Sequence, residues 1–164
     1  MGILINTTDF VGKYSIAQNS FSKLNEYINE YETQYLYDLL GKTLADLFIA
    51  SVVNNQPVGA NYLAIYNVIE LEILFNVERN EGMKNMLLGF IYYEYMRKSP
   101  IKNTITGSVV NANENSTPTF DCWGLTTRYN SSVNDYKVIQ YYINQNLTNY
   151  TDYLGSQKEF ALPF

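Results

Sequence analysis

The chain has 164 residues, of which 46% are hydrophobic and only 16% are charged, and its formal net charge is −5. This length predicts a single domain, 1–164, with enough apolar side chain for a core. The acidic balance argues against tight nucleic-acid binding, which depends largely on neutralising phosphates. With no histidine and one cysteine, Cys122, the sequence excludes an intramolecular disulfide and a zinc site of the Cys/His type.

Tyrosine, with 16 copies, and asparagine take the place of charge. Tyrosine gives large, rigid contact area with a polar tip, and charged residues are depleted at the cores of protein interfaces. This composition therefore fits a surface that is buried between protein partners. An AT-rich coding sequence would favour the same residue types, and the two explanations can hold together.

The first helix is expected from about Ser20 to Leu40, followed by Gly41 as a C-terminal stop. Its apolar residues recur at spacings of three and four: Phe21, Leu24, Ile28, Tyr31, Tyr35 and Leu39. Thr43 followed by Asp46 resembles a capping box that opens a second helix. The apolar face of this second helix would contain Leu44, Leu47, Phe48 and Val52. The polar stretch 54–59 then ends it.

Residues 60–81 are ambiguous from sequence alone. Asn61–Tyr66 fits a short helix. Apolar and polar residues alternate through much of Val68–Val77, which favours a strand or an extended arm without excluding a helix.

A central helix is expected to begin at Glu81-Gly82 and to stop before Pro100. Nearly every side of it is apolar or aromatic, which is typical of a buried helix. Its apolar run Met86–Tyr93 is much shorter than the roughly 20 residues that span a bilayer, so no membrane association is expected. Gly89 lies mid-helix, where glycine costs about 1 kcal/mol relative to alanine, and a close helix crossing would offset that cost.

Residues 101–125 read as a long loop that is almost free of charge. The β-branched residues of Thr104–Val110 could form half of a hairpin. A last helix is expected from about Asn130 to Tyr150, followed by the tail 151–164. The predicted fold class is mainly α: a small helical bundle, with its helical core at about 20–150, a long loop or β-hairpin before the last helix, and an extended C-terminal tail.

The sequence contains no recognisable catalytic set. Without histidine the commonest general base is missing. Glu70 and Glu72 would point the same way on a strand, but a solvated face explains them more simply than a carboxylate pair. Cys122 lacks a nearby histidine, and we expect no turnover that depends on Glu70, Glu72, Asp121 or Cys122. We therefore expect a protein that is not an enzyme, with no cofactor and no metal.

The segment Glu81–Ser116 carries a family resemblance, in the pattern EGMKNMLLGFIYYEYMRKS followed, after a short spacer, by TITGSVVNANENS. ETQYLYDLLGKTLADLF (Glu32–Phe48) and LTTRYNSSVNDYKVIQYYI (Leu125–Ile143) extend it to roughly half of the chain. In the order and spacing of these apolar-helix patterns the chain resembles the head–tail connector (adaptor) proteins of tailed bacteriophages, and most of all the ring protein of crAss-like phages. The stretch Ala60–Val77 matches poorly.

The resemblance implies a small helical bundle that forms a twelvefold homo-oligomeric ring in the virion neck, assembled in the host cytoplasm. Such a ring joins the portal protein to the next ring or tail protein and extends a channel through which DNA passes without tight binding. The alternatives are another neck or tail-completion ring protein, or a small helical enzyme or accessory protein.

Two segments are candidate interaction sites under this interpretation. The long loop would pair with neighbouring subunits through Thr104, Thr106, Val109, Val110, Asn111, Asn113 and Asn115. The tail would dock into a partner ring through Phe160, Leu162 and Phe164, with folding back onto its own bundle as the alternative.

Overall fold

The computed structural model describes residues 2–16, 21–73, 76–98, 101–104, 107–110, 122–158 and 160. The described chain is mainly helical, as predicted, with α1 (Phe21–Ala50), α2 (Ala60–Tyr66), α3 (Met83–Lys98) and α4 (Cys122–Gln145). Short 3-10 turns occur at Thr7–Asp9, Gly12–Tyr14 and Leu147–Asn149. None of the described helices is both long enough and apolar enough to cross a membrane.

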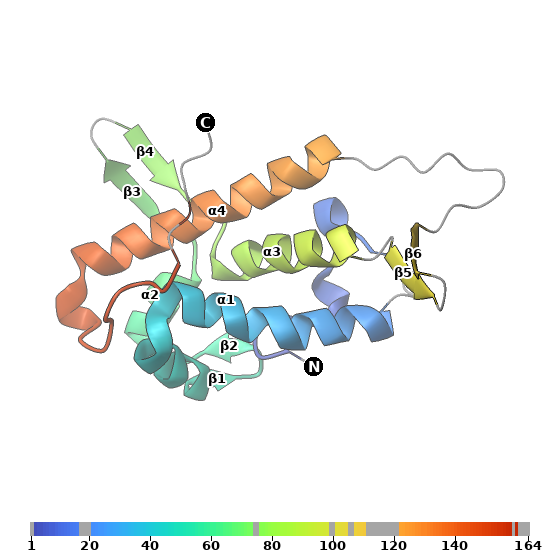
Figure 1. The fold of residues 1–164 in the computed structure, drawn as a ribbon. Coiled ribbons are helices and arrows are strands. Elements are labelled where there is room, and N and C mark those ends of the chain that lie inside the picture. The colour runs from blue at the N-terminus through green and yellow to red at the C-terminus, as the bar shows by residue number, and fades with distance from the viewer. Residues whose placement is uncertain are drawn as a thin grey trace.

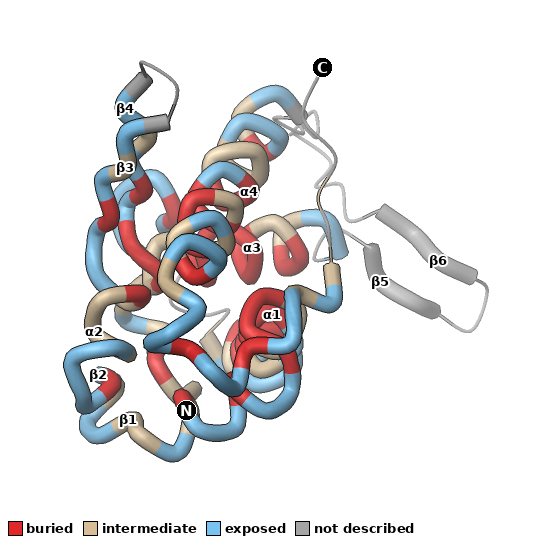
Figure 2. Tube along the Cα trace, turned by 90° about the vertical axis from the view of Figure 1, so that its left-hand side faces the viewer, coloured by how far each residue is buried: buried red, intermediate tan, exposed pale blue. Residues whose placement is uncertain are grey.

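The central position of α3 is confirmed: it lies between α1 and α4, with the buried residues gathered where the three helices meet (Figures 1 and 2). Leu87, Phe90 and Ile91 are fully buried, as the apolar pattern predicts. The Phe90 ring stacks on Tyr35 of α1 with centroids 4.3 Å apart, and it meets Tyr136 of α4 edge to face. One aromatic residue of α3 therefore joins all three helices.

Gly89 lies at a close helix crossing, as we expected from the cost of a glycine in the middle of a helix. A Cβ at this position would collide with the hydroxyl of Ser132 on α4 and would lie 3.0 Å from the Tyr14 hydroxyl. The short distance between α3 and α4 therefore leaves room only for a glycine at this position.

Gly41 separates two helical segments within α1, in agreement with its predicted role as a helix stop. Its φ of 68° and ψ of 165° are not helical, and the chain resumes a helix that runs on to Ala50. The predicted capping box is wrong, because the Asp46 carboxylate accepts hydrogen bonds from the Tyr37 hydroxyl and the Lys42 ammonium group instead. On the predicted apolar face, Leu44 and Phe48 are buried, whereas Leu47 is 43% exposed.

Three two-stranded antiparallel hairpins occur in the described residues: β1 (Val52–Val53) with β2 (Gln56–Pro57), β3 (Glu70–Ile73) with β4 (Asn76–Arg79), and β5 (Ile101–Thr104) with β6 (Gly107–Val110). Asn54 and Asn55 close the first with positive φ angles of 53° and 62°, which asparagine tolerates. The second hairpin resolves the ambiguous stretch in favour of strands. Val52, predicted on a helix, lies in β1.

The last helix starts earlier than predicted, at Cys122 rather than near Asn130, and residues 122–125 therefore belong to α4 and not to the long loop. Leu125 is 6% exposed, so the apolar stripe of α4 extends more than a turn beyond its predicted start. Weak helix formers, Gly124 and Thr126-Thr127, obscured that extension in the sequence. The helix also ends earlier, at Gln145, before the 3-10 turn Leu147–Asn149.

Candidate functional site

The predicted interface loop forms a hairpin over part of its length. Thr104 pairs with Gly107, Lys102 with Val109 and Ile101 with Val110. The hairpin lies at the end of the molecule where α1 begins and α3 ends (Figure 1). The other predicted interface residues, Thr106, Asn111, Asn113 and Asn115, lie outside the described residues, as does Asp121.

The C-terminal segment folds back along its own bundle as far as Phe160. The Phe160 ring stacks on Phe90 at 5.4 Å and meets the edge of Tyr136 at 4.8 Å. The segment that leads to Phe160 is fixed to α1 by a backbone hydrogen bond, which the Gln157 N–H donates to the Asp38 carbonyl at 2.9 Å. This is the fold-back alternative, so Phe160 is not left open for a partner in this structure. Leu162 and Phe164 lie outside the described residues.

The C-terminal segment that leads to Phe160, here called the strap, is held at a second point by a side-chain hydroxyl of α4. The Tyr136 hydroxyl lies 2.7 Å from the Asp38 carbonyl on α1 and 2.9 Å from the Lys158 carbonyl on the strap. Gln140 of α4 also donates to the Ser156 hydroxyl. Three parts of the chain, α1, α4 and the strap, therefore meet at Tyr136.

The β3–β4 hairpin projects from the helical body, and sequence reasoning did not single it out as an interaction site (Figures 1 and 2). Glu70 and Glu72 are exposed, as the solvated-face interpretation expects. Glu70 contacts Arg79 across the strands at 3.3 Å, and Val77, opposite Glu72, is 70% exposed. In contrast, Leu71 lies partly buried against the core. The hairpin therefore has one face on the bundle and one mixed charged and apolar face in solvent.

A buried polar clamp fixes the base of this hairpin. Asn80, fully buried, accepts the Ile69 N–H on its side-chain oxygen at 2.6 Å and donates its own N–H to the Ile69 carbonyl at 3.1 Å. Next to it, the Glu81 N–H donates to the buried carboxylate of Asp135 on α4 at 2.9 Å. Burial raises the pKa of Asp135, and the hydrogen bonds from Glu81 and Asn85 oppose that rise. The base of the hairpin is therefore anchored to α4, and Asn85 of α3 donates to the same carboxylate.

A second buried carboxylate holds the N-terminal segment. Glu32 of α1 is 1% exposed and accepts the backbone N–H groups of Ile3, Leu4 and Ile5 at 2.6, 2.6 and 2.9 Å. Desolvation raises the pKa of Glu32, while these three hydrogen bonds lower it. The sequence pattern of the first helix places Glu32 on a solvated polar face, and this prediction is wrong because the partners that bury the carboxylate lie almost thirty residues away in the chain.

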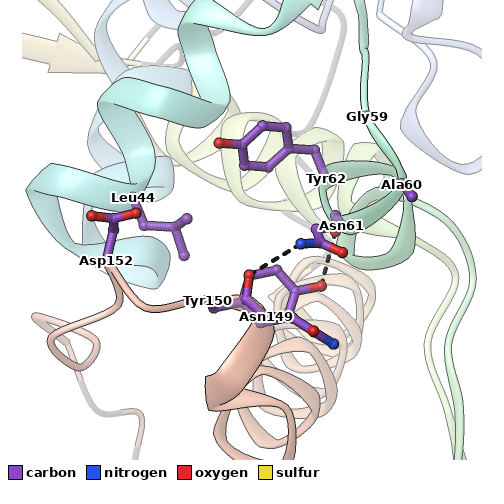
Figure 3. A pocket seen from close by; sticks show the side chains of 8 residues that line it. All are labelled: Leu44, Gly59, Ala60, Asn61, Tyr62, Asn149, Tyr150 and Asp152. Atoms are coloured by element: carbon purple, nitrogen blue, oxygen red, sulfur yellow. Dashed lines mark hydrogen bonds between the residues drawn. The ribbon is translucent and has the colours of Figure 1, made fainter.

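A polar hollow of about 290 Å³ lies between the second half of α1, the start of α2 and the turn after α4 (Figure 3). Asn61 donates to the Asn149 carbonyl at 3.1 Å, and the Tyr150 hydroxyl donates to the Asn61 carbonyl at 2.8 Å. Its one carboxylate, Asp152, is exposed. These contacts join α2 to the C-terminal segment, and they bring no nucleophile and base together.

Of the residues considered for catalysis, Glu70 and Glu72 lie exposed on β3, where Glu70 contacts Arg79. Asp121 and the side chain of Cys122 lie outside the described part of the structure. No group of three or more His, Cys, Asp or Glu that could hold a metal ion occurs within the residues described.

Comparison of the chain with protein-family models, with curated proteins and with solved structures finds no match. The case for a function therefore rests on the sequence pattern and on the geometry above.

Proposed function

We propose that this protein is a structural subunit of a dodecameric ring in the neck of a tailed bacteriophage, where it joins the portal to the tail and extends the DNA channel. The proposal starts from the resemblance of about half of the chain to head–tail connector proteins. The mainly helical bundle and the hairpin before α4 agree with the fold that this resemblance implies.

The observation that supports it best is the pair of β-hairpins, β3–β4 and β5–β6, that lie at different ends of one helical body (Figure 1). Isolated two-stranded hairpins are at best marginally stable in water, and their open edges can pair with other chains. A ring subunit needs two different side surfaces, because its contacts are head to tail. Hairpins at separate places supply two such surfaces.

The chemistry of the surface is compatible with a DNA channel. The chain carries a net charge of −5, so phosphates are not held tightly and DNA can slide through the lumen. We assign no catalytic, metal-binding or cofactor-binding residue to this function.

The proposal is tested by measuring molecular mass by light scattering over a concentration series, for the chain alone and after mixing with the portal protein of the same genome. We expect a species of about 230 kDa, twelve times the 18.9 kDa chain, or a complex with the portal. Electron microscopy of that species should show a twelvefold ring. A chain that stays monomeric under both conditions contradicts the proposal.

A further inference from the structure

We propose that Trp123 of one copy inserts into the polar hollow of a second copy, so that the chain associates head to tail. The inference rests on the proposed function, since it names a contact that would repeat around the ring. The two halves of the contact, Trp123 in the first turn of α4 and the hollow between α1, α2 and the turn after α4, both lie in the described residues.

Trp123 is the largest of the exposed hydrophobic side chains in the described residues, and it is 85% exposed. Tryptophan side chains are mostly buried in folded proteins. At protein interfaces, tryptophan is enriched among the few residues that supply most of the binding energy. An indole that a single chain leaves in water is therefore a candidate anchor for a partner.

The polar hollow has room for such a side chain. Its volume of about 290 Å³ is roughly ten times the share of one water molecule in the liquid, which is enough for a bicyclic ring. Tyr62 and Tyr150 line it, and the Tyr62 ring is held edge to face against Phe48 at 5.8 Å (Figure 3). Aromatic rings pack favourably in offset or edge-to-face arrangements. The Asp152 carboxylate also lines the hollow and would accept the indole N–H, which is only a donor.

Hydrogen bonds form the hollow before a partner arrives. The Asn61 amide donates to the Asn149 carbonyl at 3.1 Å, and the Asn61 carbonyl accepts the Tyr150 hydroxyl at 2.8 Å. These bonds fix the start of α2 to the turn after α4 (Figure 3). A site that is already formed loses less conformational entropy when it binds.

Exposed aliphatic residues follow or precede the residues that line the hollow. Four of them lie within three positions of a lining residue in the chain: Leu47, Val58, Leu147 and Leu154. The residues around an interface anchor typically serve to exclude water from it. This end of the molecule therefore offers apolar area as well as a hollow.

The two halves of the contact lie at opposite ends of the molecule. α4 begins beside the end of α3, whereas the hollow lies at the other end, where α1 and α4 end and α2 begins (Figure 1). One copy therefore cannot fill its own hollow with Trp123. A contact between two different surfaces is heterologous, and it closes into a ring when the rotation between neighbours divides a full turn.

The charges near the two halves are of opposite sign. Beside the start of α4, the last turn of α3 carries Arg97 and Lys98, which share the Glu94 carboxylate at 2.7 and 3.9 Å. Two cations against one carboxylate leave this place net positive. The hollow contains the exposed carboxylate of Asp152. Opposite potentials steer the encounter and fix the orientation of the two copies.

The first test reads the surroundings of Trp123 directly, because it is the only tryptophan of the chain. It is replaced by 5-hydroxytryptophan, whose fluorescence can be excited separately from that of tryptophan in the portal protein. We expect the label to be open to acrylamide quenching in the dilute chain and shielded after assembly, alone or with the portal. A label that stays equally open to quenching in the assembled species overturns the inference and leaves the ring proposal standing.

The second test removes each half of the contact. Ala60→Phe places a ring in the polar hollow, and Ala50→Phe makes the same change at an exposed alanine outside the lining residues. We expect Trp123→Ala and Ala60→Phe each to raise the concentration needed for half-assembly by about tenfold or more, as the loss of an anchor residue does. Ala50→Phe should leave it near the unmodified value. Normal assembly of Trp123→Ala or Ala60→Phe, or an equal loss in Ala50→Phe, overturns the inference.

A mixture of the two variants separates a head-to-tail contact from an effect on folding. The Trp123→Ala chain keeps an intact hollow and the Ala60→Phe chain keeps Trp123, so a single productive contact is possible between them. We expect a paired complex of about 38 kDa, twice the 18.9 kDa chain, in which the remaining tryptophan is shielded from acrylamide. Absence of this complex under conditions in which the unmodified chain assembles overturns the inference. Failure of the unmodified chain to assemble, alone or with the portal, overturns both proposals.

Discussion

Phe90 is the residue on which the packing of the bundle depends most visibly. It is fully buried and its ring meets Tyr35, Tyr136 and Phe160 from three other segments. We expect Phe90→Ala to lower the free energy of unfolding by about 3–5 kcal/mol, because it removes buried area and leaves a cavity. Trp123→Ala is the control, since that ring is 85% exposed and its loss should cost less than about 0.5 kcal/mol. Both values come from urea unfolding, and equal effects of the two substitutions would contradict the assignment.

Glu32 makes stability depend on pH in a direction opposite to that of a surface salt bridge. Burial raises its pKa above 4.5, the ordinary value, so the native state binds more protons than the unfolded state at pH values just above 4.5. The contribution of Glu32 to stability is therefore greatest at acid pH and falls as pH rises through that window. We expect the unfolding free energy of the Glu32→Gln variant to fall less steeply there than that of the parent.

The comparison requires denaturant unfolding of both proteins between about pH 4.5 and pH 7. Glu32→Gln should also be less stable by about 1–3 kcal/mol in the pH range where Glu32 is ionised, because an amide cannot accept all three N–H groups of Ile3, Leu4 and Ile5 as a carboxylate does. Parallel pH profiles for the two proteins would show that Glu32 titrates as it does in the unfolded chain.

At the scale of elements, the crossing of α3 and α4 depends on a missing side chain at Gly89. Gly89→Ala gains about 1 kcal/mol of helix propensity, but its methyl group meets the Ser132 hydroxyl and forces the helices apart. We expect a net loss of about 1–3 kcal/mol. In the double variant with Ser132→Ala, part of that loss should be recovered, because the hydroxyl is gone, and the double-mutant cycle should give a favourable coupling. Strict additivity would place the two helices further apart than the structure does.

Elements with one strong periodicity could be predicted from sequence, and those that depend on distant partners could not. The apolar pattern around Phe90 gave the central helix, and the alternation in Val68–Val77 indicated a strand that is now confirmed. Gly41, predicted as a helix stop, has non-helical backbone angles where two helical segments of α1 meet. Gly124 and the adjoining threonines hid the first turns of α4.

The candidate sites also divide into features that the sequence indicates and features that depend on distant partners. The projecting β3–β4 hairpin could have been suspected from its alternating pattern. The hydrogen bonds at its base, between Ile69 and Asn80 and from Glu81 to Asp135 of α4, have no local signal in the sequence. Phe160 was recognised as an apolar residue that must be buried somewhere. Whether it folds back or docks was decided by the fit of its ring among Phe90, Tyr129 and Tyr136, a property of α3 and α4 together.

At the scale of the whole molecule, the C-terminal strap closes the bundle. Removal of residues 157–164 takes away Phe160 and the hydrogen bond from Gln157 to α1. Burial of such a ring contributes roughly 1.5–3 kcal/mol, and about 1 kcal/mol shifts the midpoint of a domain of this size by roughly 2–4 °C. We expect the thermal midpoint to fall by roughly 5–10 °C. An unchanged midpoint, with incorporation into particles lost, would favour docking of the tail into a partner instead.

We expect the loop before α4 to be more important for assembly than for folding. The buried core found in the described residues lies outside 108–116, so a chain that lacks this segment should keep its helical circular dichroism and a midpoint within a few degrees of the parent. It should nevertheless fail to form rings, because the deletion removes most of β6 and part of the loop that we expect to pair with neighbouring subunits. The measurement is the mass distribution with and without the portal protein, alongside proteolysis near Asn111–Ser116, which we expect to be fast in the free chain and slow after assembly. A deletion variant that builds normal twelvefold necks would place the subunit contact elsewhere on the bundle.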